Sequence, residues 1–562
     1  MSSTRPPWRL ATPSFAAVGL LATIVVFLFV RELGTPVYDD AYFFKRFALN
    51  AIEHQTLAWN LADGPVHGCT SQAFVVVAII AALFSHTHYV VVIKGIGAAS
   101  LMLAGGLLAR WGARHAPEGS PAPMLVLLGL GSPLALSTVL SGMETAMTMA
   151  VLAGVLVVML RPGTEPDDGP SPLVAALLTA LVYLCRPDVA VVPAVVYAGH
   201  AWRATGRLPW RYALMLAASI GVVWAALWAY YGTPLPLSFY MKTAGVQSYG
   251  EFMMNAAAEQ KQLHVGLTLL FAAPLLWIAG HRRDPINVAL LAAVASLWAY
   301  HAGFTTEIMG YRGRFYAPGF IPLTMAAMRG HAAFVERGRR GLAVGLLLVL
   351  TVVMVIGYRQ HWVPSSQDDP LSQVLWPSYA GLGLGAAWVM LASPRIGAHI
   401  QGLGLGAITI AAVLGWKPPA LSPLRADHQL LRRHDRQVTT TRGIFDVARC
   451  LETPTVYHSE MGVTGLVLFR SRVVDLVGLL SDNRLRGESF EQQCQRDQPE
   501  AIFLPHRGYR DLNAEIQRSS CIGDYQRVVD RSSSPLHIRR DLVAGFMACA
   551  RDVQRFRARP KR

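Results

Sequence analysis

The sequence predicts an all-α, polytopic membrane protein with about 13 transmembrane helices in residues 1–416, followed by a soluble α/β domain at residues 417–562. Three observations lead to this prediction. Hydrophobic residues make up 53% of the 562 residues and charged residues 15%, and the mean hydropathy of +0.35 is too high for a soluble enzyme. Apolar runs recur up to about residue 415, separated by short connections rich in arginine. Polar sequence then begins near Pro418, Pro419 and Pro423.

Each apolar run of sufficient length is a candidate crossing, and the first is taken as an uncleaved span because no convincing cleavage site precedes Asp39. The crossings are expected near residues 13–31, 89–109, 124–140, 143–160, 173–185, 187–202, 212–231, 263–280, 286–304, 316–330, 341–357, 376–393 and 399–415.

Basic residues orient these crossings. They recur at every second connection, as the positive-inside rule expects of cytoplasmic loops, at Arg110 and Arg114, Arg203 to Arg211, Arg282 and Arg283, Arg337 to Arg340, and Arg395. The net charge of +15 is thereby explained without nucleic acid, which we exclude as a partner. The run at 71–84 would break the alternation as a full crossing. We therefore assign 32–88 to the first extracytoplasmic loop, with amphipathic and apolar parts on or in the membrane surface.

This topology gathers the unusual polar segments on the extracytoplasmic face of a bacterial inner membrane, where the C-terminal domain also lies. Polar residues beside membrane spans are costly unless they face a cavity or a partner. The adjacent carboxylates of Asp39 and Asp40 are the clearest case. Their alternative role is a solvated pair that ends the first helix.

Several short motifs resemble those of GT-C glycosyltransferases that use polyprenyl-phosphate sugars, especially the mycobacterial-type terminal arabinofuranosyltransferases. Asp39-Asp40-Ala41-Tyr42, then Asn60 and the turn Gly68-Cys69-Thr70-Ser71, resemble their first extracytoplasmic loop, although Cys69 stands where an aromatic residue is usual. The further matches, in the same order as in the family, are Ser141 to Thr145, Arg186-Pro187-Asp188, Gly232 to Thr243, and Arg312 to Tyr316 with Pro318.

The resemblance implies transfer of a sugar, arabinofuranose in the first instance, from a donor similar to decaprenyl-phosphoarabinose, with inversion at the anomeric carbon. The acceptor would be a glycan or a pilin-like protein. Three alternatives remain open: the same chemistry with mannose or aminoarabinose, a lipid or sugar transporter, and a structural membrane scaffold. A transporter predicts two related halves with broken helices, and no internal repeat is found.

Such a reaction needs a base for the acceptor hydroxyl and cations for the leaving phosphate. Asp39 or Asp40 is the candidate base, with a slight preference for Asp39. Arg312, Arg314 and Lys242 are the candidate phosphate ligands, because guanidinium and ammonium groups carry the required charge. We expect no certain cofactor or metal ligand set; a divalent cation on the carboxylate pair is the alternative.

Other residues near the predicted site could bind substrate. Each also has a structural explanation, such as a helix-end contact or an incidental loop position. The candidates are Glu144, Arg186, Asp188, His67, Glu307 and Tyr316.

The C-terminal part predicts strands near 455–458, 473–477 and 501–504, helices near 442–451, 459–469 and 487–497, and a solvated or lipid-surface tail at 551–562. His458, Glu460 and Asp475 could contact an acceptor, although core packing and capping explain them as well. The cysteines of this part, Cys450, Cys494, Cys521 and Cys549, would form one or two disulfides outside the cytoplasm or remain free thiols, and their pairing is left open.

Overall fold

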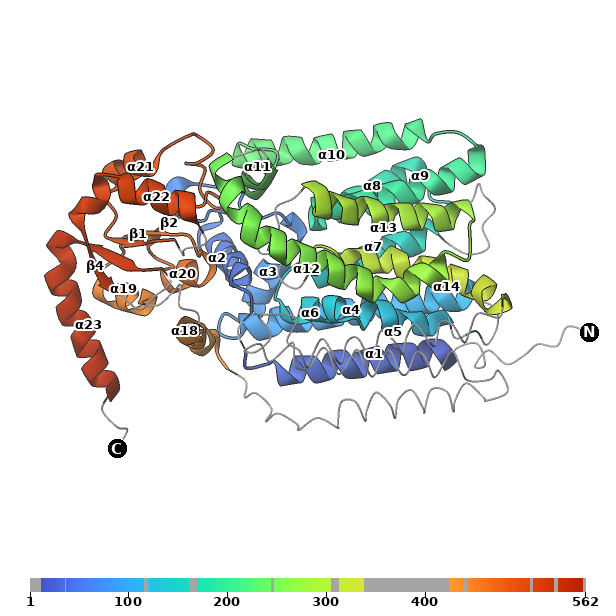
Figure 1. Cartoon of the computed structure of the whole chain (residues 1–562), viewed down its shortest axis with the longest axis horizontal. Coiled ribbons are helices and arrows are strands. Elements are labelled where there is room, and N and C mark those ends of the chain that lie inside the picture. The colour runs from blue at the N-terminus through green and yellow to red at the C-terminus, as the bar shows by residue number, and fades with distance from the viewer. Residues whose placement is uncertain are drawn as a thin grey trace, which may run out of the picture.

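The computed structural model of the whole chain describes residues 12–35, 37–115, 120, 122–160, 169–243, 247–304, 313–337, 425–437, 443–505, 509–529 and 534–558. Figure 1 shows two parts along the longest axis, a bundle of roughly parallel helices and a mixed α/β domain against one end of it.

The bundle is built from helices that follow the predicted apolar runs. Their bounds are α1 Thr12–Arg31, α4 Tyr89–His115, α5 Leu125–Leu130, α6 Pro133–Leu140, α7 Thr145–Met159, α8 Pro172–Cys185, α9 Val191–Thr205, α10 Trp210–Tyr231, α12 Gln247–Ala279, α13 Pro285–Phe304 and α14 Phe320–Glu336. Two of them begin with Ser-Pro pairs in which the serine hydroxyl accepts a backbone N–H, Ser132 in α6 and Ser171 in α8.

Among the described residues, four helices are long and apolar enough to cross a membrane, namely those covering Tyr89–His115, Trp210–Tyr231, Gln262–Ala279 and Pro285–Phe304. The predicted span 124–140 is a broken pair of helices that bend by 61°. The expected crossings at 341–357, 376–393 and 399–415 lie outside the described residues, as does the domain boundary at 416 and 417. The number of 13 crossings therefore stays a prediction.

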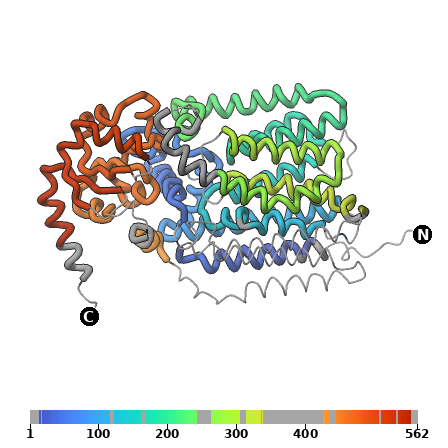
Figure 2. Tube along the Cα trace, viewed as in Figure 1, coloured from blue at the N-terminus to red at the C-terminus, as the bar shows by residue number. Residues whose placement is uncertain are grey.

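The first loop folds into two helices between the bundle and the α/β domain (Figure 2). Helix α2, Asp39–His54, is buried on nearly all sides, with Tyr42, Phe44 and Phe47 among its buried side chains, and a 3₁₀ turn, η2, follows at Leu61–Asp63. Helix α3, Gln72–Phe84, has 13 residues and is about 20 Å long, which is too short to cross a hydrocarbon core of about 30 Å. Helices α7 and α8, which lie in runs predicted to cross, are of similar length at 15 and 14 residues, so the assignment of this run to the loop stays a prediction.

The C-terminal part contains a five-stranded sheet of order β2-β1-β3-β5-β4. Strands β1 Thr455–His458, β2 Arg472–Asp475 and β3 Ala501–Phe503 are parallel and confirm the predicted strands, whereas the antiparallel β4 Tyr525–Val529 and β5 Leu536–Arg539 were not predicted. The helices are α18 Asp427–Gln437, α19 Ile444–Cys450, α20 Gly462–Val467, α21 Phe490–Asp497, α22 Arg510–Arg518 and α23 Val543–Ala558. Helix α23 extends into the predicted tail as far as Ala558, and the solvated or lipid-surface position of 551–562 stays a prediction.

Two disulfides fasten this domain. Cys450 pairs with Cys549, which joins the end of α19 to α23, and Cys494 in α21 pairs with Cys521. Cys69 and Cys185 are free and buried. The four cysteines of the polar C-terminal part are therefore all oxidised, and those two of the membrane part are reduced.

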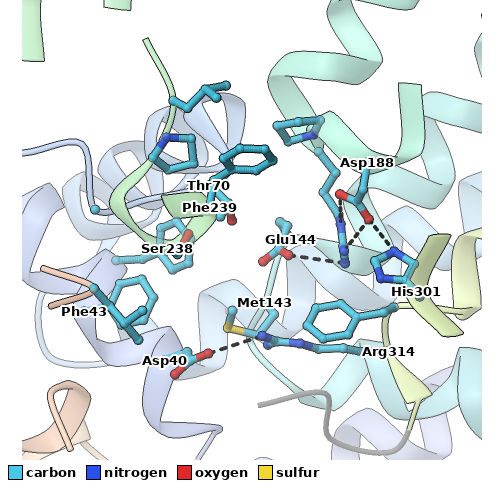
Figure 3. A pocket seen from close by; sticks show the side chains of 18 of the residues that line it. Asp40, Phe43, Thr70, Met143, Glu144, Asp188, Ser238, Phe239, His301 and Arg314 are labelled. Atoms are coloured by element: carbon cyan, nitrogen blue, oxygen red, sulfur yellow. Dashed lines mark hydrogen bonds and ion pairs between the residues drawn. The ribbon is translucent and has the colours of Figure 1, made fainter. Parts of the chain in front are cut away.

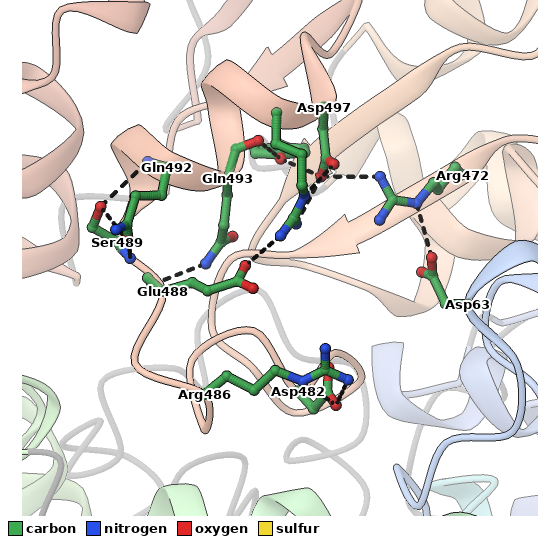
Figure 4. Close-up of polar contacts among 11 residues, drawn as sticks. Asp63, Arg472, Asp482, Arg486, Glu488, Ser489, Gln492, Gln493 and Asp497 are labelled. Atoms are coloured by element: carbon green, nitrogen blue, oxygen red, sulfur yellow. Dashed lines mark hydrogen bonds and ion pairs between the residues drawn. The ribbon is translucent and has the colours of Figure 1, made fainter.

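The first loop binds the C-terminal domain through polar contacts. The Trp59 indole donates to the Val473 carbonyl at 2.8 Å, and the Lys45 ammonium pairs with the buried Asp427 carboxylate at 2.7 Å. Figure 4 shows Arg472 between Asp63 of the loop, at 3.0 Å, and Asp497 of its own domain, at 2.9 Å. The first loop and the C-terminal domain thus form one continuous unit at the end of the bundle.

Candidate active site

A cavity of about 530 Å³ lies where the bundle, the first loop and the C-terminal domain meet. Its lining includes six of the predicted site residues, brought together from four separate segments: Asp39, Asp40, Glu144, Arg186, Asp188 and Arg314. Figure 3 shows how the labelled side chains point toward one another around this space. The expected convergence of scattered polar motifs on one face is thus visible in the fold.

Asp40 and Arg314 form a buried ion pair across the cavity wall. The Arg314 guanidinium donates through Nη2 to the Asp40 carboxylate at 3.2 Å, and the two side chains are 6% and 7% exposed. The other two nitrogens of Arg314, Nε and Nη1, have no hydrogen-bond acceptor in the described part of the chain. Buried N–H groups without partners are costly, so this guanidinium has capacity for a further anion.

Asp39 faces the C-terminal domain. Its two carboxylate oxygens accept the backbone N–H groups of Gly462, at 2.7 Å, and Val463, at 2.9 Å. Burial raises the pKa of Asp39 above its usual range, and the two N–H donors oppose that shift. Asp39 and Asp40 are adjacent at the start of α2, but Asp39 binds the C-terminal domain and Asp40 binds Arg314.

The opposite side of the cavity holds a chain of ionic contacts. Arg186 lies 3.6 Å from the Glu144 carboxylate and donates twice to Asp188, at 2.6 and 3.2 Å. The same carboxylate contacts the His301 imidazole at 2.9 Å. These residues come from the ends of α7 and α8, from the turn before α9 and from the last turn of α13, and their contacts fix the relative positions of those helices.

Phe315 separates the two charged groups. The Arg186 and Arg314 guanidinium carbons both lie 5.1 Å from its ring centroid, and the His301 ring stacks on it at 5.2 Å. An aromatic face between two guanidinium groups stabilises both by cation–π attraction.

His301, Tyr300 and Phe315 also line the cavity, and none of the three was predicted as a site residue. A signal for the first was present, because a histidine inside the apolar run 286–304 is costly unless it faces a polar site. Phe315 lay within the recognised motif but carries no charge.

His67 lies beside the main cavity and is absent from its lining. Its ring stacks on Tyr231 at 4.8 Å, and Nδ1 is 3.2 Å from the Thr233 carbonyl oxygen. Burial lowers the pKa of His67 to about 4, so the ring is neutral at physiological pH. Its contacts join the first loop to the segment after α10.

Of the four remaining predicted residues, only Tyr316 has a described side chain, and it does not line the cavity. Tyr316 is 1% exposed, and its carbonyl accepts the Trp298 indole N–H at 2.9 Å. Lys242 lies in α11, Leu237–Thr243, and the structure describes its backbone only. Glu307 and Arg312 lie outside the described residues. Within the described ranges no three His, Cys, Asp or Glu side chains are arranged to hold a metal ion, and the divalent cation stays an untested prediction.

The cavity also has a side toward helices with exposed apolar side chains. Trp224 of α10, which is 41% exposed, donates to the Tyr183 hydroxyl of α8, and both residues line the cavity together with Ser296 and Tyr300 of α13. The cavity thus extends from the C-terminal domain to helices whose outer faces are apolar.

No family model and no curated protein matches this sequence. Two solved structures match the fold. The crystal structure of ArnT from Cupriavidus metallidurans bound to undecaprenyl phosphate aligns with a TM-score of 0.56 at 12% identity, over 92% of this chain and 97% of that one. The apo state of the same protein gives 0.54 at 13% identity, over 94% and 98%. The chain therefore shares the fold of ArnT along nearly its whole length.

Proposed function

We propose that this chain is an integral membrane glycosyltransferase that moves a sugar from a polyprenyl-phosphate donor to an acceptor glycan or protein at the extracytoplasmic face. The motifs that resemble those of GT-C transferases support this proposal, and so does the fold shared with ArnT, whose crystal structure holds undecaprenyl phosphate.

The Asp40–Arg314 pair is the observation that carries the proposal, because one ion pair supplies both groups that the reaction needs. The donor phosphate would bind the unpartnered Nε and Nη1 groups of Arg314. This contact would draw the guanidinium toward the phosphate and weaken its hold on Asp40. The Asp40 carboxylate, with the guanidinium drawn away, would then accept the proton of the acceptor hydroxyl. We therefore assign the base to Asp40 and not to Asp39.

The chemistry is a single displacement. The acceptor oxygen forms a bond to the anomeric carbon while the bond from that carbon to the phosphate oxygen breaks, and the hydroxyl proton passes to Asp40. Arg314 stabilises the negative charge that develops on the leaving phosphate. One displacement inverts the anomeric configuration, in agreement with what the resemblance implies. Glu144, Arg186, Asp188 and His301 would hold the opposite wall in place.

The two substrates would enter from different directions. The side of the cavity between Trp224 and Tyr300 suits a prenyl chain, because it adjoins helices with apolar outer faces. The acceptor would come from the aqueous side, beneath the C-terminal domain.

Two observations support an extracytoplasmic position of that domain. Disulfides persist in oxidising compartments, and the C-terminal domain contains two. Helices α4 and α9, whose last turns carry Arg114 and Arg203, end at the far end of the bundle from that domain, as expected for the cytoplasmic side (Figure 1).

We propose arabinofuranose as the sugar because the motif resemblance points there, with mannose and aminoarabinose as the alternatives. The test uses the purified protein in lipid nanodiscs with decaprenyl-phosphoarabinose, and in parallel with the two other prenyl-phosphate sugars. Arabinan fragments and pilin serve as acceptors, and released polyprenyl phosphate is measured.

Asp40→Asn is expected to lower turnover by about 10²- to 10⁴-fold with little change in donor affinity. Arg314→Met is expected to weaken donor binding. Glu53→Gln, at a carboxylate that is 50% exposed near the end of α2, is the control that keeps full activity. Unchanged turnover in Asp40→Asn would refute the assigned base. Movement of the donor across the nanodisc membrane without release of phosphate would favour a transporter.

A further inference from the structure

The C-terminal domain supplies one wall of the cavity. Ser459, Met461, Leu479 and Leu480 line it, and they lie in two turns that follow the parallel strands β1 and β2. The carboxyl ends of parallel strands are where open α/β sheets bind ligands. Here those ends face the membrane part, so the position of the domain decides the shape of the cavity.

The first of these turns is fastened by Asp39. Both of its carboxylate oxygens accept N–H groups of the turn, from Gly462 and Val463. The turn also lies directly on the Asp39 backbone, since a Cβ at Gly462 would lie 1.8 Å from the Asp39 carbonyl oxygen and 2.8 Å from its carboxyl carbon. Only glycine permits this approach.

The second turn is fastened from within the domain. The Asp475 carboxylate accepts N–H groups of Val477 at 2.8 Å, Leu479 at 2.6 Å and Leu480 at 2.9 Å. These bonds hold the two leucines in the wall. Each segment is therefore held by a carboxylate that accepts backbone N–H groups. Asp39 does this across two parts of the protein, whereas Asp475 does it within the C-terminal domain.

We propose that Asp39 is a positioning residue, which fixes the C-terminal domain over the cavity and thereby sets the affinity for the acceptor. A carboxylate with both oxygens bound to N–H groups is poorly placed to take a proton from a substrate hydroxyl. The contact between Asp39 and the C-terminal domain follows from the hydrogen bonds above, while the effect on acceptor affinity rests on the proposed function.

The test compares Asp39→Asn with Gly462→Ala in the full-length protein in nanodiscs. Asparagine keeps one acceptor oxygen and turns an NH₂ group toward the second N–H, whereas the alanine forces the turn away and leaves every carboxylate in place. Gly465→Ala is the matched control. Its added Cβ would meet the Trp59 ring at 2.0 Å, so it disturbs the same interface away from Asp39.

Hydrogen exchange of the Gly462 and Val463 amides is the first measurement. Exchange is expected to speed up by about tenfold or more in Asp39→Asn and Gly462→Ala, because charge-assisted bonds are lost, and less in Gly465→Ala. Unchanged exchange in Asp39→Asn would overturn the fastening, whether or not the protein transfers sugar.

Steady-state kinetics is the second measurement. Both variants are expected to raise the acceptor KM by about tenfold, with donor KM and kcat within about twofold of the wild type. A large loss of kcat in Asp39→Asn with normal amide exchange would identify Asp39 as the base and overturn the proposal. If the wild type transfers no sugar, the proposed function fails and the exchange result alone decides the fastening.

Discussion

The Arg46 guanidinium stacks on the Trp59 indole, with its central carbon 4.5 Å from the ring centroid, and uses all five N–H groups at the contact between the first loop and the C-terminal domain. Nε donates to the Trp59 carbonyl, Nη1 to the carbonyls of Gly465 and Leu468, and Nη2 to the Asn60 side chain and the Ser471 carbonyl. A fully satisfied guanidinium that is 2% exposed makes this contact specific as well as strong.

Arg46→Lys is therefore expected to destabilise the protein by about 3 kcal/mol or more, because three donors on one atom cannot replace a planar fork of five. Thermal unfolding followed by tryptophan fluorescence measures the loss. Arg486→Lys is the control at the exposed pair with Asp482, where a loss of about 1 kcal/mol or less is expected. Equal losses in the two variants would contradict the importance given to Arg46.

The disulfides predict the number of reactive thiols. Of six cysteines, four are paired, so a thiol reagent should label two groups in the denatured, unreduced protein and six after reduction. In the native protein both free thiols should be protected, because Cys69 and Cys185 are buried. Six labelled thiols without reduction would contradict both the pairing and an oxidising location of the domain.

Removing the longer disulfide tests its contribution to stability. The double change of Cys450 and Cys549 to serine opens a loop of 99 residues and is expected to cost about 2–5 kcal/mol. The unfolding of the C-terminal domain measures this cost. Unfolding at the wild-type temperature would show that the bridge does not stabilise the domain.

His67 is expected to have a structural role. His67→Phe keeps the stack on Tyr231 and loses the contact with the Thr233 carbonyl, so a loss of about 1–3 kcal/mol in stability is expected, with turnover within about threefold of the wild type. The rate should show no step near pH 6.5 from this ring, because burial lowers the pKa of His67 to about 4. A loss of turnover of a hundredfold or more would place His67 in substrate binding.

The convergence at the site could be foreseen because charged groups beside apolar runs have few acceptable positions. Asp40, Glu144, Arg186 and Arg314 were found on that ground. The different roles of Asp39 and Asp40 could not be foreseen. They are adjacent in sequence, and only the rotation of about 100° per helical residue directs one to the C-terminal domain and the other to Arg314.

The wall made by the C-terminal domain was hidden for another reason. Leu479 and Leu480 are apolar, like core residues. Nothing in the local sequence shows that they line the same cavity as Asp39, which lies more than 400 residues earlier in the chain. Cysteine pairing has three solutions for four residues, and only the packing of α19 on α23 selects one of them. Strand β4 was missed because most of its residues are exposed or half-buried, whereas β1 is a continuous buried run.

Glu460 of the C-terminal domain is expected to make the stability of the folded protein depend on pH. It lies between Ser459 and Met461 in the cavity wall, and its backbone N–H donates to the His458 ring at 2.8 Å. Burial and the charges of Asp39, Asp40 and Asp475 raise the pKa of Glu460 to about 8, from an ordinary value of 4.5. The folded protein thus holds a proton that the unfolded chain releases, so stability should be full below pH 4.5 as far as this group is concerned and should fall as the pH rises toward 8.

Glu460→Gln keeps a neutral side chain of the same size and should remove this slope, which makes the variant more stable than the wild type at pH 8 and similar at pH 5. Unfolding temperatures at both values measure the difference. The Glu452→Gln variant is the control, because this exposed carboxyl in the same domain should leave the slope unchanged. If Glu460→Gln and the wild type lose stability in parallel between pH 5 and 8, Glu460 is ionised in the folded protein. A cation must then offset the charges of Glu460 and its three neighbouring aspartates.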